Sequence, residues 1–368
     1  MTATDTSSPT PLGLGIIGCG RVTRTLHLPA LAGVSAIRVA ALCDPDPDAL
    51  AGTARKHGID ARFADYRDLV GHPRVDAVAV CSPPDHHVEA ALAALDAGKA
   101  VFVEKPLALT IDDCDRLAAR LEARPGRVHV GFNLRCHRLT GEARKLLQAG
   151  SLGEISCVRS VFSAATRLRG PIPDWRDAIG NGDDVLFEIA VHHFDLWRYL
   201  LDAEVASVRA ERRRGADGTT TMCVSARMDD GTLADGLFTD GSAGVNEIEC
   251  FGSGGRLRVD FGRFDGLETM PAFSHSGDLR LRARRIGDTL AGLPGAVASM
   301  RGGGDHIGSY RGQWFAFVRA LTGGETPLAI VADGRAATLV AAAARESADR
   351  GATVVLDEPR TERSRRTA

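Results

Sequence analysis

The sequence predicts an α/β protein whose first part is a doubly wound parallel sheet and whose second part contains antiparallel strands. Short apolar runs alternate with Ala- and Leu-rich helical segments over the first 132 residues, a pattern typical of parallel, right-handed strand–helix–strand units. A glycine-containing turn follows the first apolar run. Beyond residue 201 the pattern changes to extended segments separated by turn residues, which favours antiparallel pairing.

The length and composition are those of an ordinary globular protein. The chain has 368 residues, enough for two or three domains, with 44% hydrophobic and 25% charged residues. Its 45 basic and 47 acidic side chains give a net charge of -2, which does not support a nucleic acid or an anionic membrane as the main partner. No stretch is apolar enough to span a bilayer. We expect disordered ends at residues 1–11 and 359–368.

The eight cysteines are scattered along the chain and form no C-x-x-C pair. Several lie inside apolar runs, where a free cysteine behaves as a small hydrophobic residue. This usage favours a reducing, cytoplasmic location over a disulfide framework, and it predicts no zinc or other metal site.

The expected strands of the first part cover residues 14–17, 37–43, 75–81, 100–103 and 128–132. Helical segments lie between them, the first reaching about residue 32 and the others at residues 48–57, 86–97 and 111–123. Ligands of such sheets bind at the carboxyl ends of the strands. The residues that directly follow each apolar run are therefore candidates for a functional site.

The first strand-to-helix turn has the composition of a dinucleotide-binding loop. Gly18 and Gly20 allow the backbone to approach a pyrophosphate at a helix N-terminus, and Arg21 and Val22 follow in the same turn. The third small-residue position of the usual pattern is Thr23 here. The competing interpretation is a turn with a structural role alone.

An acidic residue ends the second expected strand. Asp44 lies 26 residues after Gly18, slightly beyond the usual spacing of about 20 residues. A carboxylate at this point accepts hydrogen bonds from the adenosine ribose hydroxyls and repels a 2′-phosphate. Asp44 therefore favours NAD over NADP, although Arg21 keeps NADP possible.

The apolar run at residues 100–103 ends abruptly in Glu104, Lys105 and Pro106. Such a run is typical of a buried parallel strand, so the carboxylate and the amine lie where chemistry is expected. Pro106 restricts the backbone of Lys105 to extended conformations. The competing interpretation is a surface turn with a chance ion pair.

Residues 185–201, wound as a regular helix, place their large apolar side chains on one broad arc. Glu188, His192 and Asp195 fall on the opposite arc, spaced by four and three residues. Carboxylate neighbours raise the pKa of a histidine and fix its tautomer, so His192 is a candidate general base. His193 falls on the apolar side and is interpreted as a core histidine. The competing interpretation of the polar trio is a solvated helix face.

Together these segments resemble the Gfo/Idh/MocA oxidoreductases, named for glucose–fructose oxidoreductase and inositol dehydrogenase. The motifs that carry the resemblance are GIIGCGRVTRTLHLPAL at residues 15–31, CDP at 43–45, SPPDHH at 82–87, AGKAVFVEKPL at 97–107, GFN at 131–133, GSLGEI at 150–155 and HHFD at 192–195.

The resemblance implies a Rossmann domain that binds NAD(P), over residues 12–134. It also implies a C-terminal α/β domain with a large, mostly antiparallel sheet, over residues 135–358, for substrate binding and oligomerisation. By position, Ser82, Pro83 and His87 would line the nicotinamide side of the cofactor site. Glu104 and Lys105 would contact the nicotinamide ribose and the substrate hydroxyl.

The same carry-over places Asn133, Arg135 and Asp195 near the substrate. Family loops with a Trp-Arg pair border the substrate pocket, which assigns Trp175 and Arg176 to it. The competing interpretation of that pair is a packing tryptophan beside a surface arginine.

The family's catalytic trio consists of the lysine of the E-K-P motif, an aspartate and a histidine four residues after that aspartate. Here Glu188 replaces the aspartate before His192. Its longer side chain can still orient the substrate or the histidine, but with a different geometry.

In the second half, extended segments are expected at residues 157–162, 205–211, 219–228, 232–239, 246–251 and 256–261. One face of such a sheet needs cover, which a homodimer or homotetramer interface could supply. The Gly- and Arg-rich stretch 262–308 is interpreted as a lid, an oligomer arm or an insertion, with His275 and His306 at the surface. Helices are expected at 310–321 and 333–348, followed by a short strand at 352–356.

These features predict an NAD(P)-dependent oxidoreductase acting on a carbinol or ketone of a sugar, cyclitol or related polyol. His192 would remove the hydroxyl proton, Lys105 would stabilise the developing alkoxide, and Glu188 would orient the substrate or the base. One alternative is an enzyme that oxidises its substrate transiently, performs an elimination or cleavage and recycles its NAD. Another is a non-catalytic NAD-binding regulator.

Overall fold

The computed structural model describes residues 10–121, 127–164, 185–275 and 277–356. Its backbone forms two compact units. The first contains the chain up to Leu107 together with Asp113–Gly131 and Tyr310–Val331, and the second contains Ala108–Asp112, Phe132–Ser309 and the chain from Ala332 onwards.

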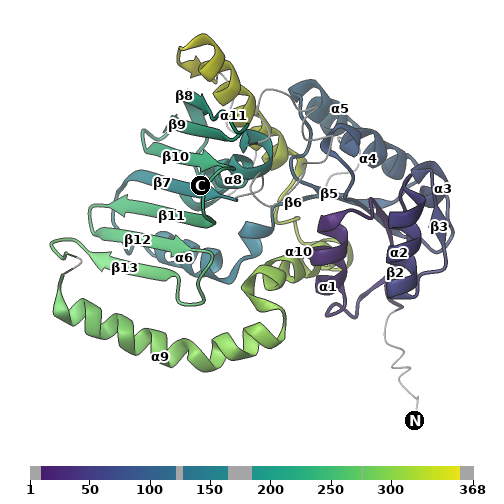
Figure 1. The fold of residues 1–368 in the computed structure, drawn as a ribbon, viewed down its shortest axis with the longest axis horizontal. Helices are drawn as coiled ribbons and strands as arrows, with labels where there is room; N and C mark the ends of the chain where they lie inside the picture. Colours follow the sequence, from purple (N-terminus) through teal and green to yellow (C-terminus); the bar gives the residue numbers. More distant parts are fainter. Residues whose placement is uncertain (1–9, 122–126, 165–184, 276, 357–368) are drawn as a thin grey trace. The chain divides into compact units, whose positions relative to one another are not determined.

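The sheet of the first unit has the order β3-β2-β1-β4-β5-β6, with every described pair parallel. The chain therefore reverses its direction of progress across the sheet between β1 and β4, which is the switch point where open α/β sheets bind ligands. This confirms the predicted parallel, doubly wound sheet. The strands are β1 (Leu12–Ile17), β2 (Ile37–Cys43), β3 (Arg62–Phe63), β4 (Ala77–Val80), β5 (Ala100–Glu104) and β6 (Val128–Gly131) (Figure 1).

Helices connect these strands, as the alternating pattern predicts. The first connection departs from a regular helix, because Thr23–His27 forms a π-helix, η1, before one α-helical turn. The helical elements are η1 (Thr23–His27), α1 (Leu28–Leu31), α2 (Pro47–His57), α3 (Tyr66–Val70), η2 (Pro84–His86), α4 (His87–Asp96) and α5 (Ile111–Leu121).

A late segment of the chain also belongs to the first unit. Most of α10 (Gly304–Thr322) packs on β5, where the Trp314 ring lies 4.4 Å from the Phe102 ring between centroids. The linear expectation of one C-terminal domain over residues 135–358 therefore differs from the structure at residues 310–331. The physical reason is that these aromatic rings bury surface that the first sheet would otherwise expose.

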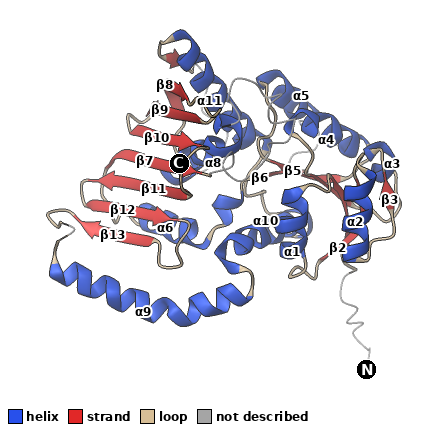
Figure 2. Ribbon diagram, in the orientation of Figure 1, coloured by secondary structure: helices blue, strands red, loops and turns tan. Residues whose placement is uncertain are grey.

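The second unit contains a mixed eight-stranded sheet with the order β13-β12-β11-β7-β10-β9-β8-β14 (red in Figure 2). β7 pairs with β10 in parallel and the other described pairs are antiparallel. This confirms the large, mostly antiparallel sheet. Its strands are β7 (Ile155–Ser163), β8 (Val205–Arg214), β9 (Thr220–Met228), β10 (Leu233–Thr239), β11 (Val245–Gly252), β12 (Gly255–Asp260), β13 (Leu267–Pro271) and β14 (Val354–Val355).

Helices of the second unit cover one face of this sheet. Along β9, the side chains that alternate toward this face, such as Met222 and Val224, are buried in one core with helical residues such as Trp197. Leu233 and Leu237 point to the opposite face and are 55% and 40% exposed. The helical elements are η3 (Asn133–Cys136), α6 (Arg138–Gln148), η5 (Val185–Ala190), α8 (Val191–Leu201), α9 (Leu279–Arg301) and α11 (Val331–Arg350).

The stretch 262–308 contains a strand and a long helix. α9 runs beside β13 (Figure 1) and buries only Ala296 among its residues. His275 and His306 are exposed, as predicted. No helix in the described part of the chain has the length and hydropathy needed to cross a membrane.

Candidate functional site

The glycine turn after β1 packs directly on the end of β4. Gly18 has φ +97°, and a Cβ built there would lie 2.5 Å from the carbonyl oxygen of Cys81 and 2.8 Å from the nitrogen of Ser82. A side chain at this position would meet both a left-handed backbone and another backbone segment. A Cβ on Gly20, by contrast, would have no heavy atom within 4 Å. The turn therefore leaves open space at its second glycine.

Thr23 closes the turn at the position where the usual pattern has glycine or alanine. Its hydroxyl donates a 2.6 Å hydrogen bond to the carbonyl oxygen of Gly18, and the side chain is fully buried. The next residues form η1, so the hydroxyl fixes the beginning of a helix that is locally widened. Arg21 is exposed and Val22 half-buried in the same turn.

Asp44, at the end of β2, lies against the glycine turn as the sequence predicts. Its Oδ2 accepts a 2.6 Å hydrogen bond from the backbone N–H of Cys19, and its Oδ1 accepts one of 2.9 Å from Asp46. Each carboxylate oxygen can accept a further bond, because it has a second lone pair. Burial, followed by the charge of Asp44, raises the pKa of the Cys19 thiol to about 12, so Cys19 is an inert neighbour.

The carboxylate of Glu104 points into the first unit. Its Oε1 lies 2.8 Å from Nε2 of His27, and its Oε2 accepts a 3.0 Å hydrogen bond from the backbone N–H of Lys105. Only 6% of the residue is exposed. The resemblance assigns Glu104 to the nicotinamide ribose, but the internal partners of both oxygens favour a supporting role. The half-buried Lys105 is the member of the motif that reaches the surface.

His27 is fully buried in an aromatic cage. Its ring meets the rings of Phe102, Tyr310 and Trp314 edge-on, at 5.6, 5.1 and 5.5 Å between centroids. Burial opposes a charge on this ring, but Cys81 and Glu104 outweigh it and raise the pKa of His27 to about 10. The shift favours the charged form of a histidine that lies beside a carboxylate, out of contact with water.

His87 joins the turn after β4 to the turn after β5. Its Nδ1 lies 2.8 Å from the carbonyl oxygen of Pro106, and its Nε2 lies 2.9 Å from that of Ser82. The residue is 1% exposed, and burial lowers its pKa. Both ring nitrogens thus have backbone partners, which favours a supporting role over direct contact with a cofactor. Pro83 follows Ser82 as a half-buried residue.

The candidate base and its carboxylate lie in the second unit. His192 is 9% exposed on α8, with the rings of Phe132 and Phe162 at 6.5 and 6.3 Å between centroids, and Glu188 is half-buried in η5. The interpretation as a solvated helix face is wrong for His192 and Asp195, because both are buried. Winding residues 185–201 as one regular helix is also wrong over 185–190, which form a π-helix.

Asp195 is held by arginine. Its Oδ2 accepts a 2.7 Å hydrogen bond from Nε of Arg135, and its Oδ1 accepts from Nη2 of the same guanidinium. Nη1 of Arg135 also donates to Asp333, at 3.1 Å. Burial opposes the charge on Arg135, but the two aspartates raise its pKa above the ordinary value. We expected Arg135 and Asp195 at the substrate, and their mutual contacts favour a structural role.

Two neighbouring residues also have internal partners. Nδ2 of the buried Asn133 donates a 2.9 Å hydrogen bond to Oγ of Ser309. Nε2 of His193 lies 2.9 Å from Oδ1 of Asn246, and burial lowers the pKa of His193 to about 4. The interpretation of His193 as a core histidine is confirmed. Trp175 and Arg176 lie outside the described residues.

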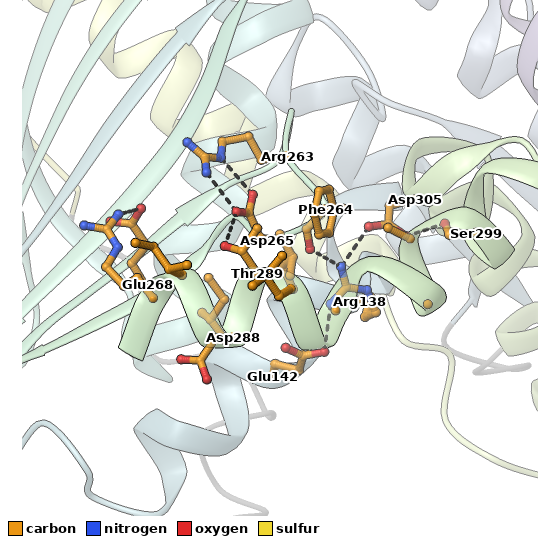
Figure 3. A pocket seen from close by; sticks show the side chains of 18 of the residues that line it. Arg138, Glu142, Arg263, Phe264, Asp265, Glu268, Asp288, Thr289, Ser299 and Asp305 are labelled. Atoms are coloured by element: carbon orange, nitrogen blue, oxygen red, sulfur yellow. Dashed lines mark hydrogen bonds and ion pairs between the residues drawn. The ribbon is translucent and has the colours of Figure 1, made fainter. Parts of the chain in front are cut away.

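A cavity of about 1000 Å³ lies between α9 and the β13 side of the second unit (Figure 3). Several of its charged side chains pair with one another: Nη2 of Arg138 lies 2.9 Å from Asp305, and Asp265 binds Arg263 at 2.9 Å and Thr289 at 2.8 Å. None of the predicted site residues that the structure describes lines this cavity. It is therefore a feature separate from the candidate site.

Sequence reasoning missed the role of His27. The available signal is the carboxylate at the end of the apolar strand: a buried Glu104 needs a cation or donors. The first helix supplies one, in the HLPAL part of the glycine-turn motif. Distance in the sequence conceals the pairing, since 77 residues separate the two.

The geometry of the first unit alone is suited to binding a dinucleotide. The open space beside Gly20 admits a phosphate, and Asp44 keeps acceptor capacity at the end of β2. Oγ of Ser82 is buried and has no hydrogen-bond partner among the described residues. These three groups follow β1, β2 and β4, around the switch point of the sheet.

Comparison with known families agrees with this geometry. The family model described as "Oxidoreductase family, NAD-binding Rossmann fold" matches residues 12–132. A second model, "GFO/IDH/MocA C-terminal domain", matches residues 140–258. The two matches fall on the two predicted sheets.

Curated relatives are similar over nearly the whole chain. A myo-inositol 2-dehydrogenase of Thermotoga maritima is 29% identical over 356 residues, covering 94% of this chain and 98% of the relative. Inositol 2-dehydrogenase 1 of Saccharopolyspora erythraea is 30% identical over 361 residues, covering 94% and 95%.

Solved structures share the fold. The myo-inositol dehydrogenase of Lactobacillus casei, in complex with NAD(H) and myo-inositol, has a TM-score of 0.73 at 22% identity, covering 96% of this chain and 98% of the other. The scyllo-inositol dehydrogenase of the same organism, with bound NAD(H) and scyllo-inositol, also has a TM-score of 0.73, at 20% identity and with 94% and 99% coverage. From these matches and the motifs above, the chain belongs to the Gfo/Idh/MocA family of oxidoreductases, with an NAD-binding Rossmann domain.

Proposed function

We propose that this protein is an NAD-dependent oxidoreductase that moves a hydride between nicotinamide and a carbinol or ketone of a polyhydroxylated ring. The observation that carries the proposal is the arrangement of the first unit. There, Gly18 and Gly20 form the dinucleotide turn, and Lys105 follows a strand of the same parallel sheet. A cationic amine beside a dinucleotide site is suited to stabilising a developing alkoxide.

The choice of NAD over NADP rests on Asp44. Its carboxylate lies at the glycine turn. A carboxylate there accepts hydrogen bonds from the ribose hydroxyls and repels a 2′-phosphate. The exposed Arg21 is the residue available to offset that repulsion. We expect measurable turnover with both cofactors, and higher turnover with NAD.

The residues of this chain divide the proton chemistry between them. His192 removes the substrate hydroxyl proton in the oxidative direction, and Lys105 donates hydrogen bonds to the oxygen as negative charge develops. Glu188 orients the substrate or His192. Bound nicotinamide supplies the hydride acceptor or donor. The low exposure of His192 limits its access to bulk water.

The substrate class rests on relatives. Two inositol 2-dehydrogenases cover 94% of this chain at 29% and 30% identity. Inositols and their keto forms are therefore the first substrates to test, followed by ring sugars.

The test is the absorbance of reduced nicotinamide after purified protein is mixed with NAD or NADP and a panel of inositols, sugars and keto forms. Lys105→Ala and His192→Asn should lower kcat by at least about 100-fold. Lys56→Ala, on the exposed side of α2, is the matched control and should leave turnover unchanged. Turnover that survives in both site variants would contradict the assigned roles.

Two other outcomes would redirect the proposal. Substrate conversion without net absorbance change, with NAD retained by the protein, would identify transient oxidation with cofactor recycling. NAD binding without any conversion across the panel would favour a regulator. Both outcomes keep the dinucleotide site and replace the net reaction.

The exposed face of the second sheet leads us to propose a homo-oligomer. Leu233 and Leu237 lie on the strand β10 and remain 55% and 40% exposed. Light scattering should give a mass of two or four chains. Leu237→Lys should lower that mass, whereas a monomeric native protein would contradict the proposal.

A further inference from the structure

Lys105 is held through its backbone on both sides. Before it, Oε2 of Glu104 accepts its N–H at 3.0 Å. After it, the carbonyl oxygen of Pro106 lies 2.8 Å from Nδ1 of His87. The residues on either side of Lys105 are buried, while Lys105 itself is half-buried. The backbone that carries the Lys105 side chain is therefore held by two buried groups.

His87 is built as a bridge between two turns. It begins α4, and its ring reaches the turn after β5 through Nδ1 and the turn after β4 through Nε2, where the Ser82 carbonyl lies at 2.9 Å. With 1% exposure the ring has little surface for a ligand. Loss of either contact would free one turn while leaving the other held.

We propose that His87 is a positioning residue that fixes Lys105 by donating a hydrogen bond from Nδ1 to the Pro106 carbonyl. The inference rests on the proposed function, in which Lys105 acts on the substrate oxygen. It assigns His87 no contact with substrate or cofactor. The contact with Ser82 has a different consequence, because Ser82 follows β4 at the switch point where the cofactor is expected.

Two conservative substitutions separate the contacts. The amide nitrogen of asparagine lies near the place of Nδ1, so His87→Asn keeps a donor for Pro106. The amide nitrogen of glutamine lies near the place of Nε2, so His87→Gln contacts Ser82 and leaves no donor for Pro106. Both variants retain a polar side chain of similar size in the same buried space.

The expected result is a split between kcat and KM. A displacement of about 1 Å at a reacting group can cost 100-fold in rate, so His87→Gln should lower kcat by roughly 10- to 100-fold with little change in the KM for NAD. His87→Asn should keep kcat within about threefold and raise the KM for NAD. Equal kcat values in the two variants, or the opposite order, would overturn the proposal.

A second readout does not depend on turnover or on the folding of a variant. In the native protein labelled with ¹⁵N-histidine, the ring nitrogen shifts of His87 show which nitrogen carries a proton. The proposal requires a proton on Nδ1, and a ring protonated on Nε2 alone would overturn it. Absence of turnover with a proton on Nδ1 would count against the proposed function, while the backbone tether would stand.

Discussion

Replacing Arg135 by methionine should destabilise the protein rather than weaken substrate binding. The guanidinium is fully buried and binds two carboxylates, with Nε 2.7 Å from Asp195 and Nη1 3.1 Å from Asp333. Asp333 also lies 3.4 Å from Nη1 of Arg198, so it keeps a cationic neighbour in the variant. Asp195 loses the partner that binds both of its oxygens.

The size of the stability loss follows from the Asp195 charge, which loses its arginine partner while it stays buried. Removing one partner of a buried ion pair costs about 3–5 kcal/mol, because the remaining charge stays buried without compensation. In a unit of this size, each kcal/mol lowers Tm by about 2–4 °C, so Arg135→Met should lower it by roughly 6–20 °C. The double variant Arg135→Met with Asp195→Asn should recover about half of the loss, because it removes the stranded charge.

The assay is thermal unfolding of the full chain, combined with KM measurements on the panel substrate that gives the highest turnover. Arg135→Lys is the matched control, which keeps the charge but loses the two-pronged geometry, and its cost should be intermediate. A variant with unchanged Tm and a KM raised tenfold or more would refute the structural assignment. That result would restore Arg135 as a substrate ligand.

Three further predictions concern the first unit. Because the pKa of His27 is raised from 6.5 to about 10, its stabilisation of the fold should be complete below pH 6.5 and be lost as pH rises through 10, by an amount on the order of 5 kcal/mol at most. Urea unfolding of the native protein and of His27→Gln from pH 6 to 10 checks this. Equal slopes of unfolding free energy against pH in the two proteins would contradict it. Gly18→Ala should destabilise the protein and abolish NAD binding, since its Cβ would lie 2.5 Å from a backbone oxygen. Gly20→Ala should fold normally and bind NAD more weakly, as measured by calorimetry, and normal folding of both variants would contradict the packing described. Thr23→Val should cost about 1 kcal/mol, the worth of one hydrogen bond, measured by the urea midpoint, and an unchanged midpoint would show that the hydroxyl bond to Gly18 contributes nothing.

Features set by neighbouring residues could be predicted from the sequence. Gly18, Gly20 and Asp44 occupy the ends of the first two strands, and strand ends are readable from apolar runs and turn residues. The position of Lys105, directly after an apolar strand, follows from the same pattern. The parallel sheet, the antiparallel pairs and the buried His193 all follow from local periodicity and composition.

Features that depend on residues far apart in the sequence could not be predicted in this way. The pairing of Arg135 with Asp333, which lies 198 residues later in the chain, has no signal in the local sequence. The same holds for the contact between Glu104 and His27, which are 77 residues apart. The π-helix at Val185–Ala190 is invisible to a pattern drawn at 3.6 residues per turn.

Hydride transfer between a substrate carbinol and nicotinamide can be followed with a deuterium label. The most direct test is mass spectrometry of the cofactor after the protein is incubated with NAD and myo-inositol deuterated at its carbinol carbons, followed by the other ring polyols in deuterated form. We predict deuterium in the reduced nicotinamide, with transfer slowed at least about 100-fold in Lys105→Ala. NAD that binds the native protein but acquires no deuterium from any of these polyols would contradict it.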